Sequence, residues 1–155
     1  MFKILESDIP YSQAAINGIK RYDERKERLM ELENKLLEID CMMRSLTRCN
    51  EAPVSGNKNE NYRTEELIDR KVKIEKDINE LSEYLAFFDR IWEKLTEEEQ
   101  VLLRARYSGE PRERGIEWCT RPCMKLFISR REAYRRADKA LDFLCKGLYY
   151  QVSAL

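Results

Sequence analysis

The strongest constraint on this 155-residue chain is a run of large apolar residues that are spaced alternately by four and three positions. They are Ile74, Ile78, Leu81, Leu85, Phe88, Trp92 and Leu95. This spacing places the side chains along one side of an α-helix, as in the seam of a coiled coil. We interpret the cluster of Phe87, Phe88 and Trp92 as packing core. The seam predicts a long helix that needs an apolar partner.

A second seam of the same kind precedes the first one. It consists of Leu29, Leu32, Leu36, Ile39, Met43 and Leu46. The pattern predicts one helix from about Ser12, as N-cap, to Leu46, and another from about Thr64. The stretch 47–62 between them is rich in Asn, Pro, Gly and Ser and predicts a flexible loop. We therefore expect a long antiparallel helical hairpin that forms a coiled coil and a homodimer or higher homo-oligomer.

The composition excludes several functional classes. Charged residues make up 37% of the chain, with 5 Gly and 4 Pro, as in long solvated helices. Histidine is absent, which removes His-based acid–base catalysis and His metal ligation. The cysteines are odd in number and predict reduced thiols, and the pair Cys119 and Cys123 lacks two further ligands for a metal. We expect no enzyme, no cofactor and no metal site.

The start of the chain and its hydropathy bear on location. No stretch approaches 20 consecutive apolar residues, and MFKILESDIP lacks the basic-then-apolar order of a signal peptide. We expect a cytoplasmic protein without a membrane association.

Charge is divided unevenly along the chain. Acidic residues outnumber basic ones by 23 to 17 up to Leu103, whereas basic residues outnumber acidic ones by 12 to 6 after it. This division hints at a basic, polyanion-binding end.

The basic end contains two helices with clear start signals. Thr96 precedes three glutamates and predicts the N-cap of a helix that ends near Tyr107. Ser129 predicts the N-cap of a later helix with an apolar face of Ala133, Ala137, Ala140, Leu141 and Leu144. Its other face carries Arg130, Arg131, Arg135, Arg136 and Lys139. This layout is that of a helix-turn-helix, although such a charged face is equally typical of a solvated helix.

The stretch between these two helices contains Pro122. Because proline costs a hydrogen bond in mid-helix, we expect Pro122 to start a short helix, PCMKLF, after a loop with Trp118. Trp118, Met124, Leu126 and Phe127 are expected to pack against the alanine face. The basic residues of this stretch are candidate phosphate contacts: Arg112, Arg114, Arg121 and Lys125.

The runs LTEEEQVLLRARY and ISRREAYRRADKALDFL resemble the region-4 helix-turn-helix of sigma-70-type factors. The matching residues are Leu95, Glu99, Gln100, Leu102, Leu103, Arg106 and Tyr107, then Ile128, Ser129, Arg130, Ala133, Tyr134, Arg135, Ala140, Leu141 and Leu144. With the preceding seams, residues from about Ile19 to Leu148 resemble phage and prophage regulators of the ArpU and RinA type. The resemblance implies a bacterial host, DNA binding and control of phage genes.

These patterns together predict a protein of two domains. Residues 1–95 are expected to form the oligomerising hairpin and residues 96–155 a helix-turn-helix that binds double-stranded DNA as a transcriptional regulator. The predicted DNA contacts are Arg130, Arg131, Glu132, Arg135, Arg136, Lys139, Arg121 and Lys125, with Glu132 accepting from a cytosine amine. One alternative is a DNA-packaging protein like the small terminase subunits. Another is a protein-interaction module that docks RNA polymerase or a host factor.

Overall fold

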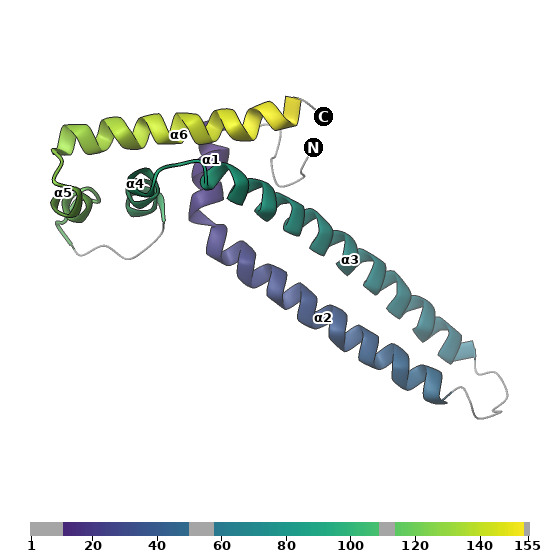
Figure 1. Ribbon diagram of the computed structural model, residues 1–155. Helices are drawn as coiled ribbons and strands as arrows, with labels where there is room; N and C mark the ends of the chain where they lie inside the picture. Colours follow the sequence, from purple (N-terminus) through teal and green to yellow (C-terminus); the bar gives the residue numbers. More distant parts are fainter. Residues whose placement is uncertain (1–10, 50–57, 109–113, 154–155) are drawn as a thin grey trace. The chain divides into compact units, whose positions relative to one another are not determined.

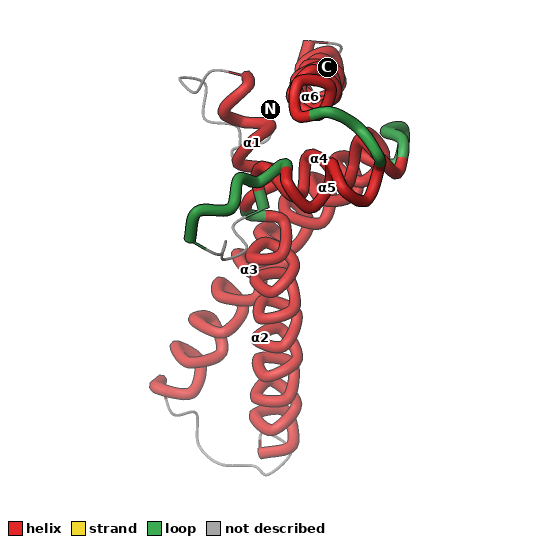
Figure 2. The backbone as a smooth tube through the Cα atoms, turned by 90° about the vertical axis from the view of Figure 1, so that its left-hand side faces the viewer, coloured by secondary structure: helices red, strands yellow, loops and turns green. Residues whose placement is uncertain are grey.

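The computed structural model describes residues 11–49, 58–108 and 114–153, and all regular structure in these ranges is helical (Figures 1 and 2). This confirms the all-α class. The elements are α1 (Tyr11–Lys20), α2 (Tyr22–Cys49), α3 (Lys58–Trp92), α4 (Glu97–Tyr107), α5 (Thr120–Leu126) and α6 (Arg130–Ser153). No helix of the described ranges is long and apolar enough to span a membrane.

The chain divides into two compact units. Unit 1 contains the residues up to Asp23 and those from Tyr84 onward, and unit 2 contains Glu24–Glu83. The long helices α2 and α3 therefore each contribute to both units. This division differs from the predicted domains 1–95 and 96–155, because α1 and the end of α3 belong with the C-terminal helices.

Unit 2 consists of the parts of α2 and α3 that run side by side in opposite directions (Figure 1). Lys71 Nζ of α3 lies 2.8 Å from Asp40 Oδ1 of α2, and this hydrogen bond raises the pKa of Lys71. The predicted seam residues face inward, since Leu32, Ile39 and Leu81 are buried. The remaining seam residues of this unit are half-buried: Leu29, Leu36, Met43, Leu46, Ile74 and Ile78.

Two predicted helix starts are wrong. α3 begins at Lys58 and not near Thr64, because the polar run after residue 57 is helical although it has no apolar period to mark it. The central residues 50–57 of the predicted loop lie outside the described residues. Ser12 is not an N-cap, because it lies inside α1.

The predicted first helix is also interrupted at Arg21, which separates α1 from α2. α1 packs against α4 and α6 within unit 1 and buries Ala15 and Ile19. Gly18 permits this packing, because a Cβ atom there would lie 2.8 Å from Cε2 of Phe88. Directly after the interruption, the Tyr22 hydroxyl donates to Asp89 Oδ1 at 2.5 Å.

Aromatic residues at the end of α3 form the centre of unit 1. Tyr84, Phe87 and Phe88 are buried, and the ring of Phe88 lies 6.3 Å from that of Tyr84 and 5.8 Å from that of Trp92. This confirms the interpretation of the cluster as packing core. α6 approaches the same region closely, since a Cβ atom at Gly147 would lie 2.7 Å from Cγ2 of Ile91.

A tight corner connects α3 to α4. The Thr96 hydroxyl accepts a hydrogen bond from the Glu99 backbone N–H at 3.3 Å, which confirms the predicted N-cap. The Gln100 side chain donates to the carbonyl oxygens of Trp92 at 3.0 Å and Leu95 at 3.3 Å. Trp92 O at the end of α3 also accepts from the Leu95 N–H at 3.0 Å, so the Gln100 side chain connects α4 to a corner that has its own backbone bond.

Candidate functional site

The candidate site is built on a cluster formed by α4, α5 and α6. Its buried residues are Leu102 of α4, Cys119 before α5, and Ala133 and Ala137 of α6. Trp118, Cys123, Leu126, Ile128 and Tyr134 pack against them. Alanine at the contact face lets α6 approach its neighbours closely. The predicted alanine face is confirmed, and Ala140 and Leu144 continue it in buried positions.

α5 begins at Thr120, two residues before the predicted start at Pro122. Pro122 lies in the first turn, where backbone N–H groups have no helical acceptor, so that proline costs no hydrogen bond there. Trp118 and Leu126 pack as predicted. The prediction is wrong for Met124 and Phe127, which are 74% and 93% exposed. The inward face of α5 instead follows the helical spacing of Cys119, Cys123 and Leu126.

A three-residue turn, Phe127–Ser129, connects α5 to α6. Phe127 has the left-handed backbone conformation (φ 55°, ψ 41°) that commonly ends a helix. The Ile128 N–H donates to Cys123 O at 3.2 Å and closes this end. The Ser129 hydroxyl accepts from the Glu132 N–H at 3.2 Å, which confirms Ser129 as the N-cap of α6.

The outward face of α6 carries Arg131, Arg135 and Lys139, all exposed and spaced by four residues. This spacing brings the three side chains onto one side of the helix, away from the alanine face. Within the described part of the chain, Arg131 and Lys139 make no ion pair. We call these three residues the outward stripe of α6.

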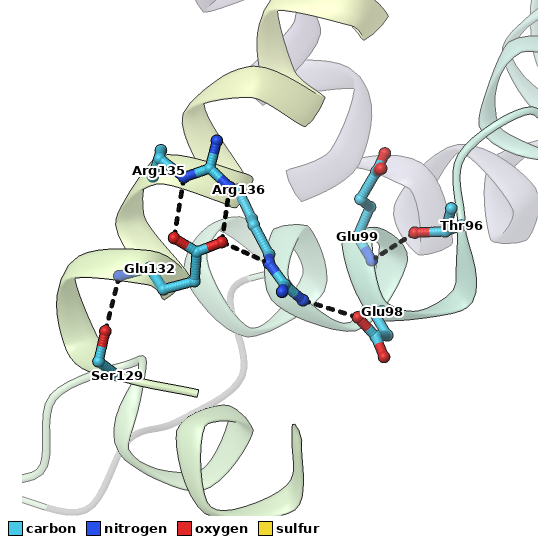
Figure 3. A network of polar contacts seen from close by, with 7 residues as sticks. All are labelled: Thr96, Glu98, Glu99, Ser129, Glu132, Arg135 and Arg136. Carbon is cyan, nitrogen blue, oxygen red and sulfur yellow. Dashed lines mark hydrogen bonds and ion pairs between the residues drawn. The ribbon is translucent and has the colours of Figure 1, made fainter. Parts of the chain in front are cut away.

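Glu132 is the centre of an ion-pair network (Figure 3). Its oxygens accept from Arg135 Nε at 2.8 Å and Nη2 at 2.6 Å, and from Arg136 Nε at 2.9 Å. The hydrogen bonds from Arg135, and then those from Arg136, lower the pKa of Glu132 to about 2. Arg136 Nη1 also lies 2.8 Å from Glu98 Oε2 and connects α6 to α4. Both carboxylate oxygens of Glu132 are thus engaged by arginines.

The other predicted contact residues are distributed around the turn. Arg130 Nη2 lies 2.9 Å from Glu117 Oε1, and its guanidinium lies 5.8 Å from the Tyr134 ring centroid. Arg121 and Lys125 are exposed on α5, and Arg114 is exposed in the preceding loop. Arg112 lies outside the described residues. The described basic residues of the predicted site therefore lie in the loop before α5, on α5 and at the start of α6.

Arg106 is a structural residue to which the sequence assigned no role. Its guanidinium lies 2.6 Å from Asp138 Oδ1 of α6 and within 5.1–5.4 Å of the ring centroids of Tyr134, Tyr107 and Trp118. It connects α4 to α6 by charge and by cation–π contacts. Burial raises the pKa of the neighbouring Tyr107 hydroxyl. The match to the pattern ending in LRARY singled out Arg106, but it did not indicate these partners.

The thiols of this region contribute to packing. Cys119 is buried, and its thiol donates to Glu117 Oε2 at 3.6 Å. Burial raises the pKa of the thiols of both Cys119 and Cys145. Among the described residues, no group of three or more Cys, Asp or Glu side chains is arranged to hold a metal ion.

Comparison of the chain with protein-family models, curated proteins and solved structures finds no match.

Proposed function

We propose that this chain is a sequence-specific DNA-binding protein in which α6 enters the major groove. The observation that carries the proposal is the three-residue turn that joins α5 to α6 and leaves the outward stripe exposed. Two helices joined by such a turn, with a third packed across them, are the arrangement by which helix-turn-helix proteins present a recognition helix. The resemblance of the sequence to region 4 of sigma-70-type factors supports the same reading.

The basic side chains of α6 differ in whether a carboxylate of the chain is paired with them. Arg131 and Lys139 carry charges that no intramolecular carboxylate neutralises among the described residues, so they are available to bases and phosphates. Arg135 and Arg130 would exchange their bonds to Glu132 and Glu117 for bonds to DNA. Arg136 bridges Glu132 and Glu98. In the proposed complex, Arg136 acts mainly by holding α6 against α4, and Glu132 by positioning Arg135.

The remaining parts of the proposal concern the phosphates and the assembly. Arg121 and Lys125 of α5 contact the DNA backbone next to the groove that α6 occupies. Unit 2 is the stem of a homodimer or higher homo-oligomer, which places two or more recognition helices on one DNA molecule. The protein then acts as a transcriptional regulator of the phage type. It does so without catalytic chemistry or a cofactor.

The test removes single charges and measures binding to duplex DNA. The variants Arg131→Ala and Lys139→Ala each remove a cation of the outward stripe without breaking an ion pair between described residues. Arg70→Ala is the matched control, because Arg70 is an exposed arginine of unit 2 paired with Glu66 at 2.9 Å. All three variants change the net charge equally.

The expected result is weaker binding for the two stripe variants and unchanged binding for Arg70→Ala. Loss of a bidentate base contact at Arg131 is expected to cost about 1–3 kcal/mol of binding free energy and to relax sequence preference. Loss of a phosphate contact at Lys139 is expected to weaken binding to all sequences and to reduce the salt dependence by about one charge. Equal affinity of all three variants would refute the assignment of α6 as the DNA-contacting helix.

The exposed apolar residues of unit 2 favour a second candidate function, a protein-interaction module. Those more than half exposed are Met30, Leu37, Met42, Tyr62 and Val72. Such residues suit contact with a second copy of the chain or with a partner such as RNA polymerase. In this candidate, the basic end is a docking platform and the chain does not bind DNA. A ring-shaped oligomer that binds DNA would instead favour the DNA-packaging alternative.

A further inference from the structure

Phe127 has two properties that do not stabilise the fold. It is 93% exposed, so that its phenyl ring is in water. Its backbone is left-handed (φ 55°), a conformation in which a Cβ atom is strained and for which glycine is the usual residue. Glycine at this position would relieve the strain and remove the exposed ring. A strained, bulky and exposed residue in an ordered turn points to a role in binding.

The phenyl ring of Phe127 does not pack in the core, because other residues of this segment occupy the inward positions. The inward residues of this segment are Cys119, Cys123, Leu126 and Ile128, which pack with Leu102 and the alanine face of α6. Met124, three positions before Phe127, is 74% exposed. The left-handed end of α5 thus presents an apolar pair to the outside.

The charges on either side of this apolar pair select its ligand. No Asp or Glu occurs between Glu117 and Glu132. In that interval Arg121 and Lys125 precede Phe127, and Arg130 and Arg131 follow it after Ile128 and Ser129. Of these four cations, Arg130 is paired with Glu117 at 2.9 Å. A cationic rim repels basic surfaces and attracts a polyanion. Of the groups that the major groove displays, the C5 methyl of thymine is apolar, and phenylalanine is among the side chains that contact it.

We propose that Phe127 contacts the C5 methyl group of a thymine in the DNA that α6 binds. The inference rests on the proposed function and adds to it the base that the turn recognises. Phe127 precedes the N-terminus of the recognition helix, so its ring meets a base at the edge of the sequence that α6 reads. Met124 extends the apolar surface behind the ring. The strained backbone fixes the direction in which the ring leaves the turn.

The test combines a protein variant with a DNA variant. Phe127→Gly removes the ring and suits the left-handed backbone, so it is expected to keep or raise the midpoint of thermal unfolding. The probe is the duplex that the wild-type protein selects from random-sequence DNA. In a series of copies, each thymine in turn is replaced by uracil, which lacks only the C5 methyl. The control is Phe143→Ala, which removes an exposed phenyl ring from α6 itself (44% exposed).

For the wild-type protein, replacement of the contacted thymine by uracil is expected to weaken binding about fourfold. This factor corresponds to the free energy of burying one methyl-sized group. Phe127→Gly is expected to bind the thymine duplex about fourfold more weakly than the wild type does. Its affinity is expected to be the same for the thymine and uracil duplexes. Phe143→Ala is expected to behave as the wild type on both duplexes.

Two results would overturn the inference while leaving DNA binding intact. Equal affinity of Phe127→Gly and the wild type for the thymine duplex would mean that the ring does not contact DNA and serves a protein partner or none. An equal loss on the thymine and uracil duplexes would mean that the ring contacts something other than the methyl group. A wild-type protein that selects no duplex would instead refute the proposed function.

Discussion

Leu102 is the residue of α4 that lies in the buried cluster shared with α5 and α6. Its side chain is fully buried, and its neighbours in the cluster are Cys119, Ala133 and Ala137. Leu102→Ala removes three carbon atoms from this cluster. Because the two alanines have no side-chain torsions with which to fill the space, the cavity persists. We expect a loss of about 3 kcal/mol or more, within the usual range of about 2–5 kcal/mol.

This loss is measurable in unit 1 by itself. A change of 1 kcal/mol shifts the unfolding midpoint of a chain of this length by about 2–4 °C, so that Leu102→Ala is expected to unfold at least about 6 °C lower. The two tryptophans of the chain, Trp92 and Trp118, both belong to unit 1. Tryptophan fluorescence therefore follows this unit, whereas far-ultraviolet circular dichroism follows the helices of both units.

The control for this prediction is Met124→Ala, because Met124 is an exposed residue of α5. We expect its midpoint to differ from that of the wild type by less than about 2 °C, since exposed substitutions change stability by about 0.5 kcal/mol or less. A fluorescence midpoint of Leu102→Ala equal to that of Met124→Ala would refute the packing described for α4 and α6.

Two further predictions follow from the titratable groups. Arginine contacts hold the pKa of Glu132 at about 2, below its ordinary value of 4.5, so that the ionised form stabilises the fold at neutral pH and this contribution is lost as the pH falls from about 4.5 toward 2. In acid-titrated unfolding experiments, the difference in stability between the wild type and Glu132→Gln should therefore narrow in that interval, and a constant difference would contradict the network. Burial raises the pKa of the Cys119 thiol, whereas Cys41 is exposed. Iodoacetamide at pH 8, followed by peptide mass spectrometry, should modify Cys41 in the folded protein and Cys119 only after unfolding, and equal rates would disprove the burial of Cys119.

Features that depend on local sequence were predicted successfully. The N-caps Thr96 and Ser129 are such features, because a side-chain oxygen bonds to a backbone N–H only three residues away. The inward direction of the seams and of the alanine face also follows from helical periodicity alone. These signals fixed the helical class and the start of α6.

Features that depend on contacts between distant residues were predicted poorly or not at all. The ion pair of Arg106 with Asp138 joins residues 32 positions apart, and that of Arg136 with Glu98 joins residues 38 positions apart. Neither pair leaves a periodic signal. Met124 and Phe127 were expected in the core because they are apolar. Their exposure depends on the left-handed end of α5, which hydrophobicity does not encode.

The start of α3 is another feature that the local sequence did not predict. The residues from Lys58 to Arg63 are polar except Tyr62 and have no apolar periodicity, but they continue the helix whose later apolar residues are packed. Helical propensity of a polar stretch is a weak signal, whereas continuity with a packed helix decides its conformation. The sequence therefore locates the packed part of a helix better than its end.

The most direct test of the central claim, that α6 binds DNA through a basic face, is the salt dependence of duplex binding by the wild-type protein. With Arg121, Lys125, Arg131 and Lys139 as cationic contacts, the logarithm of the association constant should fall with the logarithm of salt concentration with a slope of about −3 to −4 per protomer. A preferred duplex should retain its advantage over other sequences across the series. No binding at low salt, or an affinity that does not change with salt, would contradict the account.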